Sequence, residues 1–296
     1  MERKARERGA ANRASRALGA VGLAAVVMML TALMTGGLAL ASAESAADVV
    51  VPKRQPVQIA VVLDTTEPLA SLFTEGIRNA IDMAVSEHPS VRGFSVQLNT
   101  FAGPCFPTDA LALNADAAEA AVSNAQTVAV IGHMCSFAFA NVPGYDGDCV
   151  PSTIDSSPSA LAIYEANDVV TINGSTTNPC LPAVGPTVFN GLFVPENLDY
   201  NAWYSAVQAL PNDVAWHAAY AARFGKPATE FADLYYDATT LLIKRLTQTA
   251  KVKNGALTID RTALATAIRN TKNYCGATGN ITIDSSGFRT YDPRSC

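Results

Sequence analysis

The stretch that decides the fold is VAVIGHMCSFAFANVPG, residues Val128 to Gly144, in which four apolar residues run directly into Gly-His-Met-Cys-Ser. Its apolar beginning is typical of a buried strand, and Gly132 permits a close backbone turn after that strand. The stretch also raises a question about function. Cys135, two residues after His133, is either a reactive thiol or part of a loop that presents Ser136 and backbone amides to a small ligand.

Apolar runs of the same character occur on both sides of this stretch, and helical patterns separate them. The other expected strands are Val57–Leu63, Phe94–Ala102 and Asp168–Ile172. The expected helices between them are Leu72–His88, a helix from an N-cap at Thr108 to Val122, and Ala160–Ala166. Strands that alternate with helices predict right-handed βαβ units and an α/β fold with a parallel sheet.

Two regions depart from this alternation. The polar, turn-rich segment Tyr145–Ser159 is typical of an inserted surface loop. Beyond Phe193 the pattern becomes mostly helical until a strand and turn at Gly279–Gly287. The helices expected there are Tyr200–Leu210, Asp213–Phe224, Glu230–Ala250 and one that begins near Asp260.

The first 43 residues have the features of an export signal. A basic head precedes an apolar run from Leu18 to Leu40, and small residues at Ala41 and Ala43 favour cleavage before Glu44. Because the apolar run is long for a signal peptide, an uncleaved membrane anchor is the alternative. In either case the segment places the rest of the chain outside the cytoplasm, and it is the only part expected to meet a membrane.

Charge and cysteine content narrow the functional classes. The formal net charge is −5, and residues 1–43 carry most of the clustered basic residues, so the remainder is acidic and a nucleic-acid partner is not expected. An even number of cysteines in an exported chain favours disulfides, and six cysteines allow fifteen connectivities. Since the sequence has no CxxC and no histidine pair at ligand spacing, neither a metal nor a cofactor is expected.

Two polar loops follow neighbouring predicted strands. Ligands of open α/β sheets bind beyond the carboxyl ends of the strands. One loop carries Cys135 and Ser136 near the start of a predicted helix, and the other, Asn173–Pro179, concentrates hydroxyls and backbone polar groups. Side by side, the two loops could hold both ends of a zwitterion, although Ser- and Gly-rich loops after strands often do no more than turn the chain.

At these loops the sequence resembles a known family. VIGHMCS together with VVTINGSTTNP is similar to the amino-acid-binding proteins of ABC importers, which have the type I periplasmic binding fold, and in particular to the leucine/isoleucine/valine-binding proteins. The similarity extends over residues 56–195 and 217–290 and includes IRNAIDMAV, YAARFGKPATEFADLYYDATTLLIKRL and GATGNITIDSSGF. It implies non-covalent binding of a small amino-acid-like ligand, no catalysis, and an ABC permease as partner.

The resemblance assigns roles to individual residues. Ser136 would bind the ligand carboxylate, the carbonyl of Ser175 would receive the ammonium group, and Thr177 would contact both ends. Thr176 lies between these two positions, and Phe73 would line the side-chain pocket. The resemblance also implies a disulfide between Cys105 and Cys135, in which case Cys135 braces the loop of Ser136. For the remaining four cysteines we expect Cys149 to pair with Cys180 and Cys275 with Cys296, although the resemblance does not determine these two pairings.

The resemblance fails where the family has its second lobe. Too few residues follow Phe193 for a second full α/β lobe and for the helix that must return to the first. The expected division is residues 56–192 for the first lobe, 193–224 for the hinge and a reduced second lobe, 225–274 for returning helices, and 275–296 for a C-terminal strand and tail. A one-sided site predicts weak binding unless a partner or a second copy covers it.

The sequence therefore leaves three candidate functions. The first is a periplasmic solute-binding protein of a branched-chain-type amino-acid importer, whose exact ligand the sequence does not determine. The second is a ligand-less interaction or structural module derived from the same fold, for which a homodimer is one arrangement. The third and least supported is a hydrolase that uses Cys135 as its nucleophile, because no accompanying acid or oxyanion motif is present.

Overall fold

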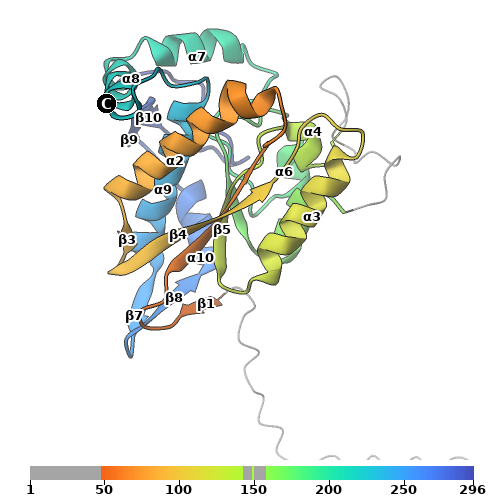
Figure 1. The fold of residues 1–296 in the computed structure, drawn as a ribbon, viewed down its shortest axis with the longest axis vertical. Helices are drawn as coiled ribbons and strands as arrows, with labels where there is room; N and C mark the ends of the chain where they lie inside the picture. The colour runs from red at the N-terminus through yellow and green to blue at the C-terminus, as the bar shows by residue number, and fades with distance from the viewer. Residues whose placement is uncertain (1–47, 143–148, 150–157) are drawn as a thin grey trace, which may run out of the picture. The chain divides into compact units, whose positions relative to one another are not determined.

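The centre of the molecule is a five-stranded sheet, seen in a computed structural model that describes residues 48–142, 149 and 158–296. The strand order is β3-β4-β2-β5-β6. The strands β2, β4, β5 and β6 run parallel, and β3 pairs antiparallel with β4. The bounds are Val57–Leu63 for β2, Ser90–Val91 for β3, Phe94–Ala102 for β4, Thr127–Gly132 for β5 and Val170–Ile172 for β6. The predicted parallel sheet is confirmed (Figure 1).

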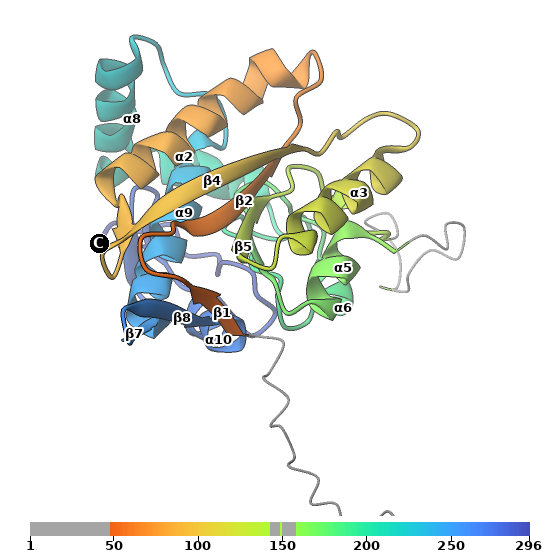
Figure 2. The ribbon, with the colours of Figure 1, turned by 60° about the horizontal axis from the view of Figure 1, so that its bottom comes forward.

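Helices cover both faces of this sheet. On one side lie α2 (Glu75–Glu87) and α9 (Ala232–Thr249), and on the other α3 (Ala110–Ser123) and α5 (Ala160–Ala166) (Figures 1 and 2). Strand β2 contributes to both cores because its side chains alternate. Val57, Ile59, Val61 and Leu63 pack with α2 and α9, whereas Ala60 and Val62 pack with α3 and α5.

Smaller elements complete the list of helices. They are the π-helical turn η1 (Ala70–Thr74), α4 (Ser136–Phe139), α6 (Leu181–Val184), α7 (Tyr200–Gln208), α8 (Pro211–Phe224) and α10 (Arg261–Arg269). Helix α10 begins next to Asp260, as expected, and Asp260 caps it by accepting a hydrogen bond from the amide of Ala263 at 2.8 Å. The cap expected at Thr108 is wrong: α3 begins at Ala110, and the Ala110 amide instead donates to the Pro107 carbonyl in a turn.

The region after Phe193 is less helical than its sequence pattern predicts. A hairpin joins β7 (Lys251–Lys253) to β8 (Ala256–Asp260), and β8 also pairs antiparallel with β1 (Asp48–Val51). The turn consists of Asn254 and Gly255, both with positive φ. A second short pair, β9 (Tyr274–Gly276) and β10 (Gly279–Ile281), follows. The Asn-Gly dipeptide is itself a strong hairpin signal.

Helices α7 and α8 lie in residues 193–224, which were expected to form the hinge and a reduced second lobe. Between Phe193 and Phe224 the described residues form these two helices and no strand. Trp203 of α7 packs against Phe193 and Leu234, and Trp216 of α8 packs against the α2 residues Ala80 and Met83. In the described part of the chain these residues therefore form two helices packed on α2 and α9, and not a second α/β unit.

Three disulfides connect segments that are distant in the sequence. They join Cys105 to Cys135, Cys149 to Cys180 and Cys275 to Cys296, as expected. The expected export signal at residues 1–43 and most of the insert Tyr145–Ser159 lie outside the described residues. Among the helices of the described part, none has the length and apolar character needed to cross a bilayer.

Candidate functional site

A cavity of about 250 Å³ lies beyond the carboxyl ends of β5 and β6. Two loops that follow these strands form its polar side. The residues that line the cavity are Leu69, Phe73, Phe106, Met134, Cys135, Ser136, Phe137, Ser175, Thr177, Glu196 and Phe231. Five of the six residues expected at a ligand site are therefore gathered around one cavity.

The sixth expected residue, Thr176, is not among the lining residues. Its side chain is fully buried, and its hydroxyl donates to Asn173 Oδ1. The amide of Thr176 also donates to Asn173 Oδ1, at 3.3 Å. Thr176 thus holds the shape of the second loop from beneath, while its two neighbours face the cavity.

Ser136 connects the two loops. Its Oγ accepts hydrogen bonds from the amides of Thr177, at 3.1 Å, and Asn178, at 3.3 Å. Since both lone pairs of the hydroxyl are used, its hydrogen is left to donate to an acceptor in the cavity. A carboxylate oxygen is an acceptor of this kind.

Ser175 fixes the second loop against α9. Its hydroxyl donates to the Met134 carbonyl at 2.8 Å and lies 2.9 Å from the hydroxyl of Tyr235, which is buried in α9. Gly174 allows this close approach, because an added Cβ would lie 2.9 Å from Leu234 Cβ. The polar side of the cavity is thus held by hydrogen bonds and by close packing.

Glu196 is a site residue that sequence reasoning missed. The Thr177 hydroxyl donates to Glu196 Oε1, and the Glu196 amide returns a hydrogen bond to the Thr177 carbonyl at 2.8 Å. Burial raises the pKa of the Glu196 carboxyl, and the Thr177 hydroxyl partly offsets this rise. No local pattern around Glu196 signals the contact, because the fold alone brings it to a loop 19 residues earlier.

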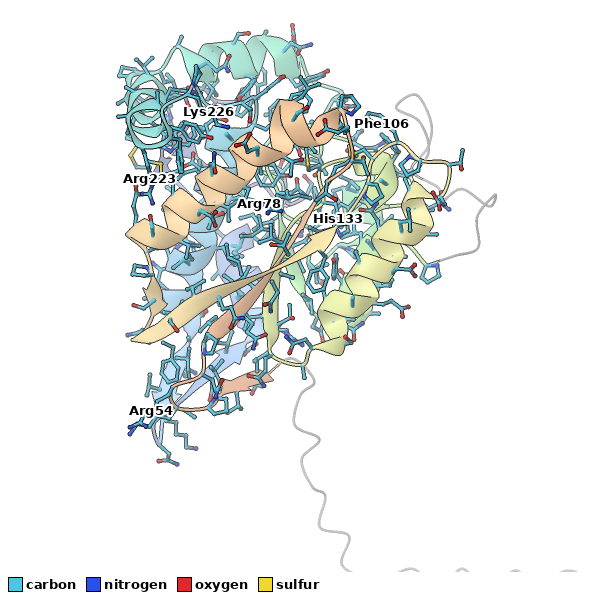
Figure 3. The ribbon with its side chains drawn as sticks, in the orientation of Figure 1. Arg54, Arg78, Phe106, His133, Arg223 and Lys226 are labelled. Carbon is cyan, nitrogen blue, oxygen red and sulfur yellow. A yellow bond between two sulfur atoms is a disulfide. The ribbon has the colours of Figure 1, made fainter. Side chains whose placement is uncertain are left out.

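The opposite side of the cavity is apolar. The ring of Phe73, in η1, lies 6.0 Å from that of Phe231, and the ring of Phe106 lies 6.0 Å from that of Phe137. Phe106 is 69% exposed and Phe137 48% exposed, so the second pair forms a rim rather than a floor. Figure 3 shows Phe106 at the periphery of the molecule.

The geometry does not support thiol chemistry. Cys135 is bonded to Cys105, and His133 points into the interior, where Nε2 lies 3.0 Å from the Tyr164 hydroxyl and Nδ1 contacts Asn114 Oδ1 (Figure 3). Burial lowers the pKa of His133 to about 3. The imidazole is therefore a neutral core group and not a base for Cys135.

Comparison with solved structures identifies the fold. The chain is similar to the leucine-binding protein LivK of Thermotoga maritima, with a TM-score of 0.58, 17% identity, and coverage of 79% of this chain and 93% of that one. An ABC transporter substrate-binding protein of Desulfitobacterium hafniense, in complex with leucine, gives a TM-score of 0.56, 16% identity, and coverage of 79% and 95%.

A third similar structure was solved with a different kind of ligand. It is a solute-binding protein of an ABC transporter from Rhodopseudomonas palustris, in complex with 3,4-dihydroxybenzoic acid, with a TM-score of 0.55, 12% identity, and coverage of 79% and 90%. No protein-family model matches the chain, and no curated protein matches it. The chain thus has the type I periplasmic binding fold, with one complete lobe and a truncated second one.

Proposed function

We propose that the cavity binds a small amino acid with an apolar side chain, and that the protein is the exported solute-binding component of an ABC importer. The observation that carries this proposal is the composition of the cavity. Ser136, Ser175, Thr177 and Glu196 form one side of it, and aromatic and aliphatic side chains form the other. A zwitterion with an apolar side chain matches both sides.

Each end of the zwitterion has a partner in this proposal. The Ser136 hydroxyl, which already accepts two backbone amides, donates to the ligand carboxylate. The half-buried Glu196 carboxylate and the Thr177 hydroxyl, which contact each other, receive the ammonium group. Charge-assisted hydrogen bonds of this kind are about twice as strong as neutral ones.

The apolar side favours leucine, isoleucine, valine or phenylalanine as the ligand. Phe73, Phe231, Leu69 and Met134 offer only carbon and sulfur to the ligand side chain. The volume of about 250 Å³ lies just below the range of about 300–1,000 Å³ that is usual for ligand pockets. A single amino acid is therefore a better match than a peptide.

Binding is expected to be weak in the isolated protein. Helices α7 and α8 replace the second lobe, so part of the ligand stays in water, where its hydrogen bonds are weakened. Calorimetric titration with leucine, isoleucine, valine and phenylalanine tests the proposal. We expect saturable one-to-one binding with a dissociation constant in the micromolar range or weaker, and sub-micromolar binding by the monomer would contradict this estimate.

Glu196→Gln gives a sharper test of the binding mode. Removing the charge should weaken leucine binding about 10- to 100-fold, because a hydrogen bond to a charged group contributes about 1.5–3 kcal/mol. Glu119→Gln, on the exposed surface of α3, is the matched control and should leave the affinity unchanged. Leucine analogues without the amino group or without the carboxylate should not bind; if they bind as well as leucine, the zwitterion model is wrong.

One observation favours an interaction module as the second candidate. Phe106 and Phe137 expose a large part of their rings at the rim of the cavity, where a partner protein could cover them. Sedimentation analysis of the purified protein would distinguish the two functions. A stable complex that Phe106→Ser and Phe137→Ser disrupt, with no response to amino acids, would support the module and not the receptor.

A further inference from the structure

A second group of polar side chains lies where α8 meets α9, outside the cavity described above. Asp213 and His217 are one helical turn apart on α8, and Asp233 is in the first turn of α9. His217 Nε2 lies 3.3 Å from Asp213 Oδ2 and 3.9 Å from Asp233 Oδ2. One ligand atom from each residue falls within 4.8 Å of the other two, so small side-chain movements would let all three bind one metal ion.

The two carboxylates are buried but incompletely satisfied. Both side chains have no exposed surface, and the oxygens of Asp213 have no partner other than the ion-pair contact with His217. Asp233 Oδ2 likewise has no hydrogen-bond partner. Buried carboxylate oxygens without partners are costly, so a charge that sits among them is strongly favoured.

Two hydrogen bonds to Oδ1 fix the orientation of the Asp233 carboxylate. Asp233 Oδ1 accepts hydrogen bonds from the Tyr204 hydroxyl, at 2.9 Å, and from the Leu234 amide, at 2.8 Å. These bonds leave Oδ2 facing His217. Hydrogen bonds to the outer oxygen of a ligating carboxylate are a regular feature of metal sites.

The buried guanidinium of Arg289 compensates the pair only through space. It makes its hydrogen bonds to Thr278 and to the carbonyl of Asn280, not to Asp213 or Asp233. Three buried carboxylates, Asp213, Asp233 and Asp237, contribute to the field at this one guanidinium. The group at α8 and α9 therefore keeps an excess of negative charge, which attracts a cation.

We propose that Asp213, His217 and Asp233 bind a divalent transition-metal ion of the Zn²⁺ type. The imidazole nitrogen argues against Mg²⁺ and Ca²⁺, which prefer oxygen ligands, whereas one nitrogen and two carboxylates suit Zn²⁺. His217 is 31% exposed, so the ion has a path from solvent and keeps a position for water. The ion joins α8, in the reduced second lobe, to α9 of the first lobe.

Zinc binding by the full protein tests this inference. After treatment with a chelator, calorimetric titration should show one Zn²⁺ per chain, and saturating Zn²⁺ should raise the melting temperature by about 5 °C or more. Co²⁺ as a probe should give visible absorption bands at the same stoichiometry. His217→Ala should weaken Zn²⁺ binding by about 100-fold or more. Mutating a residue that only hydrogen-bonds to a metal ligand already lowers metal affinity by about 10- to 100-fold, and His217 is itself a ligand in this proposal.

The chain offers a matched control. It has three histidines, of which His133 is buried and His88 is exposed. His88→Ala should leave Zn²⁺ binding unchanged, which excludes adventitious surface binding. Asp213→Asn is a second ligand variant, and circular dichroism shows whether it folds. If the wild type binds no Zn²⁺, or if His217→Ala binds as well as the wild type, then the three residues form only an ion pair and the inference is wrong.

Discussion

Ser136 is the residue on which the two ligand loops depend. Its Oγ accepts the amides of Thr177 and Asn178. Ser136→Ala leaves these buried donors without an acceptor, which should lower the free energy of unfolding by about 1–3 kcal/mol and also weaken leucine binding. Urea unfolding and leucine titration measure the two effects. Ser71→Ala, at an exposed serine that contacts Glu67, is the control and should change neither by more than about 0.5 kcal/mol.

His133 predicts a pH dependence of stability. Its pKa is lowered to about 3 by burial, whereas the unfolded chain binds the proton near pH 6.5. Between these values the unfolded state binds more protons, so stability is fully present above pH 6.5 and is lost as the pH falls. This residue should account for a loss of about 1.4 kcal/mol per pH unit below pH 6.

Urea unfolding at pH 7, 5 and 4 measures this slope. His133→Gln should be less stable at pH 7, because Tyr164 and Asn114 lose their partner, but its stability should fall less steeply with pH. His88→Gln should keep the steep slope of the wild type. Equal slopes for the wild type and His133→Gln would show that the imidazole does not stay neutral in the fold.

At the scale of the element, the turn after β5 positions the first ligand loop. Gly132 has φ +110°, and an added Cβ would lie 2.1 Å from the Val62 carbonyl oxygen on the neighbouring strand β2. Gly132→Ala should therefore lower the free energy of unfolding by about 2–5 kcal/mol, through backbone strain and overpacking together.

Substitution of a second glycine, Gly93, distinguishes the cost of backbone strain from that of overpacking. Gly93 also has positive φ, at +87°, but an added Cβ would meet nothing within 4 Å. Gly93→Ala should cost only the backbone strain, about 1–2 kcal/mol, and should leave leucine binding intact. Thermal and urea unfolding of both variants compare the costs. A loss at position 93 as large as that at position 132 would contradict the role given to Val62.

The central elements could be predicted from sequence because their patterns are long and regular. Val57–Leu63 is a nearly continuous apolar, β-branched run, which is typical of a strand buried on both faces, and the helix after it shows helical spacing. The β7–β8 hairpin was missed because β7 has only three residues, all exposed, so it carries no alternation. Its one strong signal was the Asn254-Gly255 turn.

The two sites differ in how far the sequence could predict them. Ser136 and Ser175 lie in loops directly after strands, so the topology of a parallel sheet places them at one edge. Glu196 and Asp233 reach their sites only through long-range packing, against Thr177 and His217 respectively. Sequence spacing alone gives His217 one neighbour, Asp213 at i−4, which does not distinguish a ligand pair from an ion pair.

At the scale of the whole molecule, the reduced second lobe predicts how the protein responds to ligand. Two-lobed binding proteins close around their ligands by hinge motion. Here α7 and α8 are packed on α2 and α9 through Trp203 and Trp216, so the described residues contain no second α/β lobe that could close. Saturating leucine should leave the radius of gyration unchanged within about 0.5 Å of the ~18 Å expected for a compact chain of this size.

Small-angle X-ray scattering with and without leucine measures this directly. Glu196→Gln, which should bind leucine weakly, serves as the control for effects of the added solute. A compaction of several ångströms that occurs in the wild type and not in Glu196→Gln would show that α7 and α8 move as a lid. That result would be incompatible with the packing of Trp203 against Phe193 and Leu234.

Phe231 joins the cavity to the start of α9 at a cost in backbone energy. Its φ is +67°, a left-handed conformation that penalises a bulky residue by about 1–2 kcal/mol, while its ring packs 6.0 Å from Phe73. Glycine would relax the backbone and delete the aromatic surface. The ring also packs against Phe193 and Tyr204, so its loss would cost more than the relaxed backbone returns. The unfavourable φ of Phe231 is therefore retained for an aromatic ring that serves the core and the pocket at once, and glycine at this position would weaken both.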